Sequence, residues 1–271
     1  MIQLDDGMKT AVLRRLGVAE AVPSVVLLEA LVAAYVRTVP WESVFRMAKR
    51  ARTAVTADCP RWPDEFWTDN IERGGGGTCY ESNYAFFALL RALGFEGYLT
   101  INNMRDSIGC HTACIVLLDG QKWLTDVGIP LNAPIPLNPA ALVERVTDFY
   151  TYTVTPITAD EYVINAAPRP DPYIFNLLDR PVTEAAYRVA TTNDYGPAGL
   201  FLDAVIINKI VDERLWRLNT RERPFALNTF WQGQRTDRAI EGDTAIFVGQ
   251  HFGMDAAVIR AALAVMGDSN Q

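Results

Sequence analysis

The hydrophobic positions of the first 95 residues recur at helical spacing. Residues 10–18 form a short amphipathic stretch closed by Gly17, and Ser24 is placed to cap a second, longer one. A third stretch covers residues 79–93, where apolar side chains repeat every three or four positions until Gly94. The pattern therefore predicts a helical first part of the chain.

Two segments between these helices have other patterns. Residues 46–52 carry four cations, which is typical of a solvated helix face: Arg46, Lys49, Arg50 and Arg52. Residues 58–70 mix prolines with aromatic side chains, and we expect an irregular surface segment there.

Beyond Gly94 the pattern alternates with a period of two. It predicts strands at 97–103, 111–118 and 121–127, with Asp119 and Gly120 as the two-residue turn of a hairpin. Shorter strands are expected at 149–155 and 161–165, after a proline-rich passage. These segments together predict a small antiparallel sheet or barrel.

The last third of the chain is mixed. Strands are expected at 210–218 and 244–248, and an alanine-rich helix at 255–266 with Gly267 beyond its end. Periodicity leaves residues 197–207 open between helix and strand. The chain as a whole is predicted to be of the α+β class.

Composition narrows the kinds of partner. The 271 residues are 49% hydrophobic and 21% charged, as in ordinary globular proteins. The net charge of −7, with no dominant Lys and Arg cluster, argues against nucleic acid and against a membrane surface. The N-terminus has no apolar signal-peptide core, and no run of 18 apolar residues suggests a membrane span. A cytoplasmic location is expected, with the four cysteines as thiols.

One cysteine stands where a nucleophile is favoured. Cys79 follows four consecutive glycines and opens the predicted helix at 79–93. Unpaired backbone N–H groups and the positive end of the helix dipole favour an anion there, so we expect the thiolate to form more easily than in a free cysteine. The glycine run lacks the Gly-Lys-Ser/Thr end of a phosphate-binding loop, and its predicted use is to bring backbone close to the nucleophile.

A base and its orienting group follow on the predicted hairpin. If Asp119 and Gly120 form the turn, paired positions sum to 239, and Asp126 lies diagonal to His111 on the same face. Cysteine, histidine and a carboxylate in this relation form the catalytic triad of many unrelated enzymes. His251, the other histidine, has no such companions and is expected to be structural.

A metal site is the competing interpretation, because Cys110, His111 and Cys114 are close in sequence. Structural zinc sites bring two separated ligand pairs, and neither Cys59 nor Cys79 belongs to a second pair. Cys114 fits the alternating strand as a small buried side chain. No metal site is therefore predicted.

These residues resemble the arylamine N-acetyltransferase family. The resemblance rests mainly on three segments in the family's order: Cys79-Tyr80-Glu81-x-Asn83, His111 and Asp126-Val127-Gly128. It covers residues 10–255. The weaker matches are Gly76-Gly77 before the cysteine, Leu16-Gly17-Val18, Pro40-Trp41-Glu42-Ser43, Pro136-Leu137, Tyr173-x-Phe175-Asn176 and Phe252-Gly253.

The resemblance implies a cysteine-protease-like superfold with three domains. These are a helical domain at 1–95 with the nucleophile, an antiparallel β-barrel-like domain at 96–190 with His111 and Asp126, and an α/β lid at 191–271. It implies that Cys79 takes an acyl group from a thioester such as acetyl-CoA and passes it to an amine by a ping-pong mechanism. It also implies contacts with that thioester at Gly77, Thr112 and Gly128, without a tightly bound cofactor.

Three departures from the family pattern point to a divergent member. The arginine that precedes the two glycines in the family is displaced here to Arg73 by two extra glycines; Pro130 follows the Asp-Val-Gly segment; and Ser43 replaces an asparagine. They favour, as an alternative, an amide synthase or acyltransferase of secondary metabolism that uses a larger thioester or a carrier protein. A cysteine hydrolase and a binding protein on a degenerate enzyme scaffold are further alternatives.

Overall fold

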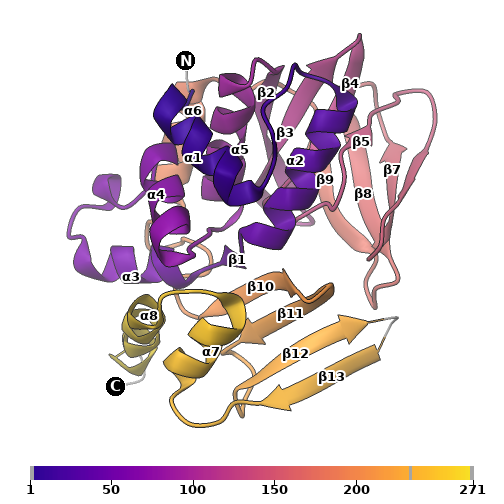
Figure 1. The fold of residues 1–271 in the computed structure, drawn as a ribbon. Helices are drawn as coiled ribbons and strands as arrows, with labels where there is room; N and C mark the ends of the chain where they lie inside the picture. Colours follow the sequence, from indigo (N-terminus) through magenta and orange to yellow (C-terminus); the bar gives the residue numbers. More distant parts are fainter. Residues whose placement is uncertain (1–2, 232–233, 269–271) are drawn as a thin grey trace.

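Helix α5 (Cys79–Ala92) is the centre of the N-terminal part (Figure 1). The computed structural model describes residues 3–231 and 234–268. In it α5 is buried from Cys79 to Leu90, as expected for a helix that is apolar on most of its circumference. Three further helices surround or adjoin it: α1 (Asp6–Leu16), α2 (Val25–Thr38) and α4 (Pro63–Arg73). The helical first part is thus confirmed, and Ser24 caps α2 as expected.

The irregular segment expected at 58–70 is wrong, because most of it is helix. Pro63 occupies the first turn of α4, acidic side chains follow it, and Gly74 ends the helix with a φ of 68°. Phe66 and Trp67 are fully buried against α5, where the Trp67 indole N–H donates to the Ala85 carbonyl at 3.0 Å. Burial of these two rings stabilises α4, and its sequence also carries the signals that start and end a helix.

The solvated face expected at residues 46–52 is also wrong in part. These residues lie on α3 (Val44–Arg52), and Arg46 is fully buried, whereas Arg52 is exposed. Helix α3 packs against α8 (Ala256–Asp268) at the other end of the chain, which covers its apolar side.

The predicted antiparallel barrel is present in the middle of the chain (Figure 1). Eight strands follow the order β5-β4-β3-β2-β9-β8-β7-β6, and the end strands β5 and β6 also contact each other, so the sheet is nearly closed. Their bounds are β2 (Glu96–Met104), β3 (Ser107–Leu118), β4 (Gln121–Thr125), β5 (Ile135–Pro136), β6 (Val143–Val146), β7 (Thr151–Pro156), β8 (Glu161–Ala167) and β9 (Tyr173–Leu178).

The C-terminal part is a second sheet covered by helices. Its order is β1-β10-β11-β12-β13, where β1 (Trp41–Glu42) comes from the N-terminal part and pairs with β10 (Ile206–Val211). The remaining strands are β11 (Arg214–Asn219), β12 (Ala226–Trp231) and β13 (Gln234–Ala239). Helix α6 (Glu184–Asn193) precedes this sheet, and α7 (Thr244–Phe252) and α8 follow it.

Two expectations for this part are wrong. Residues 210–218 are not one strand but parts of β10 and β11, because Asp212 and Glu213 both take a positive φ and turn the chain back. Residues 244–248 are helical, because Asp243 caps α7 through the Ile246 N–H and Gly253 ends it. The helix expected at 255–266 is present as α8, and the open segment 197–207 is irregular until β10 begins.

The fold is the expected α+β arrangement of helical part, barrel and α/β part. The boundary predicted at residue 95 falls between α5 and β2, whereas the one at 190 falls inside α6. Residues 1–2, 232–233 and 269–271 of the predicted domains lie outside the described residues. No helix in the described part of the chain is both long and apolar enough to cross a bilayer.

Candidate active site

Cys79 is the first residue of α5 and is almost completely buried, with 7% of its surface exposed. Its thiol lies 3.6 Å from the Cys110 carbonyl oxygen on β3. A Cβ atom added at Gly128 would stand 2.6 Å from the Cys79 Cα and 2.5 Å from the Asn83 Nδ2. Only glycine at position 128 therefore lets the loop after β4 pack directly on the cysteine.

His111 and Asp126 meet as the hairpin register predicts. Leu118 pairs with Gln121 and Cys114 with Thr125, so paired positions sum to 239, and β4 ends just before Asp126. The His111 Nε2 lies 2.6 Å from the Asp126 Oδ2, and both side chains are buried. Because Nε2 is engaged with the carboxylate, Nδ1 is the ring nitrogen left to exchange a proton with another group.

Asp126 is held by a full set of donors. Its Oδ1 accepts hydrogen bonds from the Asn83 side-chain amide at 3.0 Å and from the backbone N–H groups of Gly128 and Ile129 at 2.7 and 3.1 Å. A carboxylate with so many donors keeps one orientation, which fixes the imidazole that it contacts.

Asn83 joins helix α5, which begins at Cys79, to the β3–β4 hairpin. Besides Asp126, its amide donates to the Thr112 carbonyl at 2.6 Å, and its own oxygen accepts from the Val127 N–H at 3.0 Å. Asn83 lies one helical turn after Cys79, so both face the hairpin. That spacing was available in the sequence, but the contacts depend on how α5 packs on the barrel.

Thr112 and Tyr187 support the same helix start. The Thr112 hydroxyl donates to the Cys79 carbonyl at 3.0 Å, and the Tyr187 hydroxyl lies 3.0 Å from Thr112 and 2.9 Å from the Tyr80 carbonyl. Tyr187 comes from α6, and nothing in its local sequence marks it as part of the site.

The glycine run is buried and packs on other backbone. A Cβ at Gly76 would lie 1.7 Å from the Pro40 carbonyl oxygen, and one at Gly74 would lie 1.9 Å from the Gly253 carbonyl oxygen. Gly77 forms an isolated parallel bridge with Trp41 of β1. The glycines thus bring the segment before Cys79 into direct contact with β1 and with the end of α7.

A different arginine from Arg73 holds this loop. Arg61 is buried and donates to the Gly76 carbonyl at 2.6 Å and to the Glu81 Oε2 at 2.5 Å, while Glu42 accepts from the Gly76 N–H at 3.1 Å. Arg73 instead pairs with Asp255 near the surface at 3.0 Å. In this chain, Arg61 from the preceding segment is therefore the buried arginine of the glycine loop, and Arg73 lies nearer the surface.

The expectation of an easily formed thiolate is not supported. Burial raises the pKa of the Cys79 thiol, the carboxyl groups of Asp194 and Asp126 raise it further, and the Arg46 guanidinium opposes them. The thiol consequently needs a base to take its proton.

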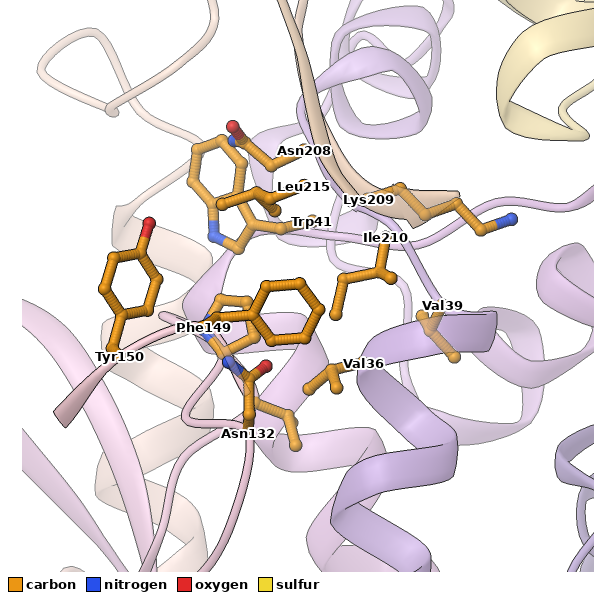
Figure 2. Close-up of a pocket in the computed structure, with 12 residues that line it drawn as sticks. Val36, Val39, Trp41, Asn132, Phe149, Tyr150, Asn208, Lys209, Ile210 and Leu215 are labelled. Carbon is orange, nitrogen blue, oxygen red and sulfur yellow. The ribbon is translucent and has the colours of Figure 1, made fainter. Parts of the chain in front are cut away.

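Two cavities lie near these residues. One of about 40 Å³ lies between α2, the loop after β4 and β10, where the rings of Trp41, Phe149 and Tyr150 gather beside aliphatic side chains (Figure 2). It holds no more than a few water molecules. The other is a groove of about 420 Å³ with Tyr80 and Cys110 at its wall, between the β2–β3 hairpin and the end of α6, and this is the size of a small-molecule site.

The other local cysteine and histidine residues have structural surroundings. The Cys114 thiol is buried and lies 3.4 Å from the Asn83 carbonyl oxygen, and His251 packs edge-on against Trp216. Among the residues that the structure describes, no three His, Cys, Asp or Glu side chains are grouped to hold a metal ion.

The helical part, nearly closed barrel and α/β part define a cysteine-protease-like fold of the N-acetyltransferase class. A family model described as N-acetyltransferase matches residues 24–242, and the chain belongs to the arylamine N-acetyltransferase family. The family groups it with the acyltransferases.

Solved structures agree on the fold across nearly the whole chain. A Mycobacterium smegmatis arylamine N-acetyltransferase superposes with a TM-score of 0.79 at 20% identity, covering 97% of this chain and 99% of that one. The Mycobacterium marinum enzyme in complex with CoA has a TM-score of 0.78 at 19% identity, covering 95% and 97%. A Bacillus cereus enzyme described as having a Cys-His-Glu catalytic triad has a TM-score of 0.73 at 19% identity, covering 93% and 100%.

A curated relative matches part of the chain. Proansamycin X synthase of Amycolatopsis mediterranei is 29% identical over 124 residues, which are 42% of this chain and 46% of that protein. The match thus spans less than half the length of that relative.

Proposed function

We propose that this protein transfers an acyl group from a thioester to an amine, with Cys79 as nucleophile, His111 as base and Asp126 as its orienting group. The observation that supports this most directly is the 2.6 Å contact between His111 and an Asp126 whose other oxygen accepts three hydrogen bonds. Because Gly128 packs on Cys79, the same loop that carries Asp126 also determines where the thiol lies.

The proposed reaction has two halves. His111 Nδ1 takes the Cys79 proton as the sulfur attacks the thioester carbonyl, and the tetrahedral intermediate collapses with release of the donor thiolate, which the imidazolium protonates. The amine then attacks the acyl-cysteine, His111 takes its proton, and Cys79 leaves as a thiolate that recovers a proton from the imidazolium. Asp126 holds the ring and stabilises its charged form in both halves.

Acetyl-CoA is the first donor that we propose, since a family member forms a complex with CoA. Gly77, Thr112 and Gly128 are proposed to shape the thioester side of the site. All three are buried and packed around Cys79 or its flanking residues, so they act through the position of the backbone.

A larger acyl thioester, free or on a carrier protein, is the second candidate donor. The groove of about 420 Å³ has a mixed lining, with Asn193 and Asp194 beside apolar side chains that include Ile101 and Leu200. Its volume and apolar part suit an extended acyl chain better than an acetyl group. The curated relative that matches part of the chain is named a synthase, and we therefore keep a donor other than acetyl-CoA as a candidate.

Intact mass after incubation with a panel of thioesters tests the proposal. The wild type should gain the mass of one acyl group, lose it on addition of an aromatic amine, and release the matching amide. Cys79→Ala should gain nothing, and Asp126→Asn should slow adduct formation by about 10²- to 10⁴-fold. Hydrolysis of the adduct by water, with no amide formed from any amine, would instead identify a hydrolase. The absence of any adduct would favour a binding protein.

A further inference from the structure

Arg46 is a buried cation beside the nucleophile's helix. It lies on α3 with none of its surface exposed, and its Nη1 donates to the Thr78 hydroxyl at 2.6 Å and to the Asp194 Oδ2 at 2.7 Å. Its Nη2 donates to the Asp194 backbone carbonyl at 2.6 Å, and its guanidinium lies 4.6 Å from the centre of the Tyr195 ring.

These contacts join α3 and the end of α6 to Thr78, the residue before Cys79. Thr78 is the residue directly before Cys79 and caps α5 without a side-chain capping bond, so its hydroxyl is committed to Arg46. Asp194 ends α6 and lines the groove described above. Arg46 therefore fixes the start of α5 against the groove wall.

A buried arginine is costly unless its charge is paired, and Arg46 forms its ion pair with Asp194. Its partner Asp194 is itself largely buried, with 14% of its side chain exposed. The titratable and charged groups that act on the Cys79 thiol are Cys110 of β3, Asp126 after β4, Tyr80 of α5, Tyr187 of α6, Asp194 after α6 and Arg46. His111 follows Cys110 on β3 and contacts Asp126. Arg46 alone among them carries a permanent positive charge.

We propose that Arg46 is a positioning residue for Cys79, which holds the helix start through Thr78 and favours the thiolate, and that Asp194 limits this effect. The inference rests on the proposed role of Cys79 as nucleophile. The two members have opposite charges and are joined to the chain at Thr78, the residue before Cys79, so we expect them to influence the thiol in opposite directions. This agrees with Arg46 lowering and Asp194 raising the pKa of Cys79.

The rate at which iodoacetamide alkylates Cys79, resolved from the other cysteines by peptide mass, tests the inference between pH 7 and 9.5. At each pH below the pKa of the Cys79 thiol, Arg46→Met should lower that rate by about tenfold. The nearly isosteric Asp194→Asn should raise it by about tenfold. The double variant should return close to the wild-type rate. Arg46→Lys keeps the charge without the fork to two partners, so its rate should lie between wild type and Arg46→Met.

Opposite changes in the alkylation rate of the two single variants would distinguish an effect of charge from a purely structural effect. If both single variants change the rate in the same direction, or neither changes it, the inference is wrong. Arg52→Met, which removes an exposed cation from the same helix, should leave the rate unchanged. Melting temperatures measured on every variant show whether a lowered rate accompanies unfolding, and Asp194→Asn predicts a gain that unfolding of the site does not explain.

The test is independent of the acyl donor, because alkylation needs no thioester. A wild-type protein that forms no acyl-cysteine with any thioester would refute the proposed function while the opposite charge effects still stood. Conversely, if the protein is an active transferase and substitution of Arg46 or Asp194 does not change the rate of Cys79 alkylation, only this inference is refuted.

Discussion

Asp126 and Gly128, two residues apart, carry most of the geometry of the candidate site. Asp126 contacts the His111 ring, and Gly128 allows the same loop to pack on Cys79. Both properties arise from backbone that turns tightly after β4, where the N–H groups of Gly128 and Ile129 point back at the carboxylate. A small change in this loop is therefore expected to move base and nucleophile relative to each other.

Gly128→Ala tests this close packing. The new methyl group would stand 2.6 Å from the Cys79 Cα, and the loop must shift by the order of an ångström, so we expect about a 10²-fold slower formation of the acyl-enzyme. Single-turnover kinetics with acetyl-CoA measure this rate. Gly267→Ala is the matched control, because a Cβ there meets nothing within 4 Å. Unchanged kinetics in Gly128→Ala would contradict the assigned role of the loop.

At the scale of elements, the segment between α4 and α5 is held by one buried network of charged side chains. Arg61 donates to Glu81 and lies 3.9 Å from Glu42, and Tyr195 also donates to Glu81, so the carboxylates are neutralised in the interior. Burial would raise the pKa of Glu81, but the charge and hydrogen bond of Arg61 outweigh it and hold that pKa below its usual value. The buried ion pair thus depends on Arg61, whereas Arg73 contributes at the surface.

Comparison of Arg61→Met with Arg73→Met distinguishes the two arginines. Removal of Arg61 leaves buried carboxylates without their cation and should cost about 3–5 kcal/mol in the free energy of unfolding. Loss of Arg73 and its half-exposed pair with Asp255 should cost about 0–1 kcal/mol. Urea titrations at neutral pH give both values. The reverse order would mean that Arg73 is the arginine that holds the loop.

The groove between the β2–β3 hairpin and the end of α6 is the element that bears on donor size. Leu200 lies at its rim with 42% of its surface exposed. Leu200→Trp should lower kcat/KM for a long acyl thioester by about tenfold or more and change acetyl transfer little, because only the longer chain needs that volume. Val146→Trp, at an exposed position of β6, controls for the added indole. An equal loss for both donors would argue against the groove as the acyl site.

At the scale of the whole molecule, the N-terminal part and the C-terminal sheet share one structure. Strand β1 adds to β10, and the buried core of that sheet includes Val44 and Phe45 of α3 together with Val258 and Ile259 of α8. Ser43, which replaces the family's asparagine, connects them: its hydroxyl donates to the Ala204 carbonyl at 2.7 Å and accepts from the Ile206 N–H at 2.9 Å. Residues from both ends of the chain therefore pack together in the part of the molecule that borders the segment before Cys79.

Ser43→Ala should weaken this connection. The Ala204 carbonyl and the Ile206 N–H would lose a buried partner, so we expect a loss of about 1–3 kcal/mol in the free energy of unfolding. Chemical denaturation followed by tryptophan fluorescence measures it. Ser107→Ala, at an exposed position of the β2–β3 hairpin, serves as the comparison and should cost less than about 0.5 kcal/mol. Equal losses would show that the Ser43 contacts do not couple the two parts.

Much of the site was predictable because it depends on local chemistry. The Asp119-Gly120 turn sets the register of β3 and β4, and both residues take the positive φ that such a turn requires. Register then places His111 and Asp126 on one face within reach of each other. The helical start at Cys79 likewise follows from a periodicity that ends at Gly94.

Tertiary structure decided the properties that depend on distant groups. Burial of Cys79 among side chains of α5, the barrel and α6 reversed the expected direction of its pKa, because desolvation of a thiolate outweighs a helix terminus. Packing also selected Arg61 over Arg73, buried Arg46, and completed the C-terminal sheet with β1. The sequence by itself determined which residues stand at turns and helix starts; only the fold decided which charges they meet, since electrostatic neighbours come from all parts of the chain.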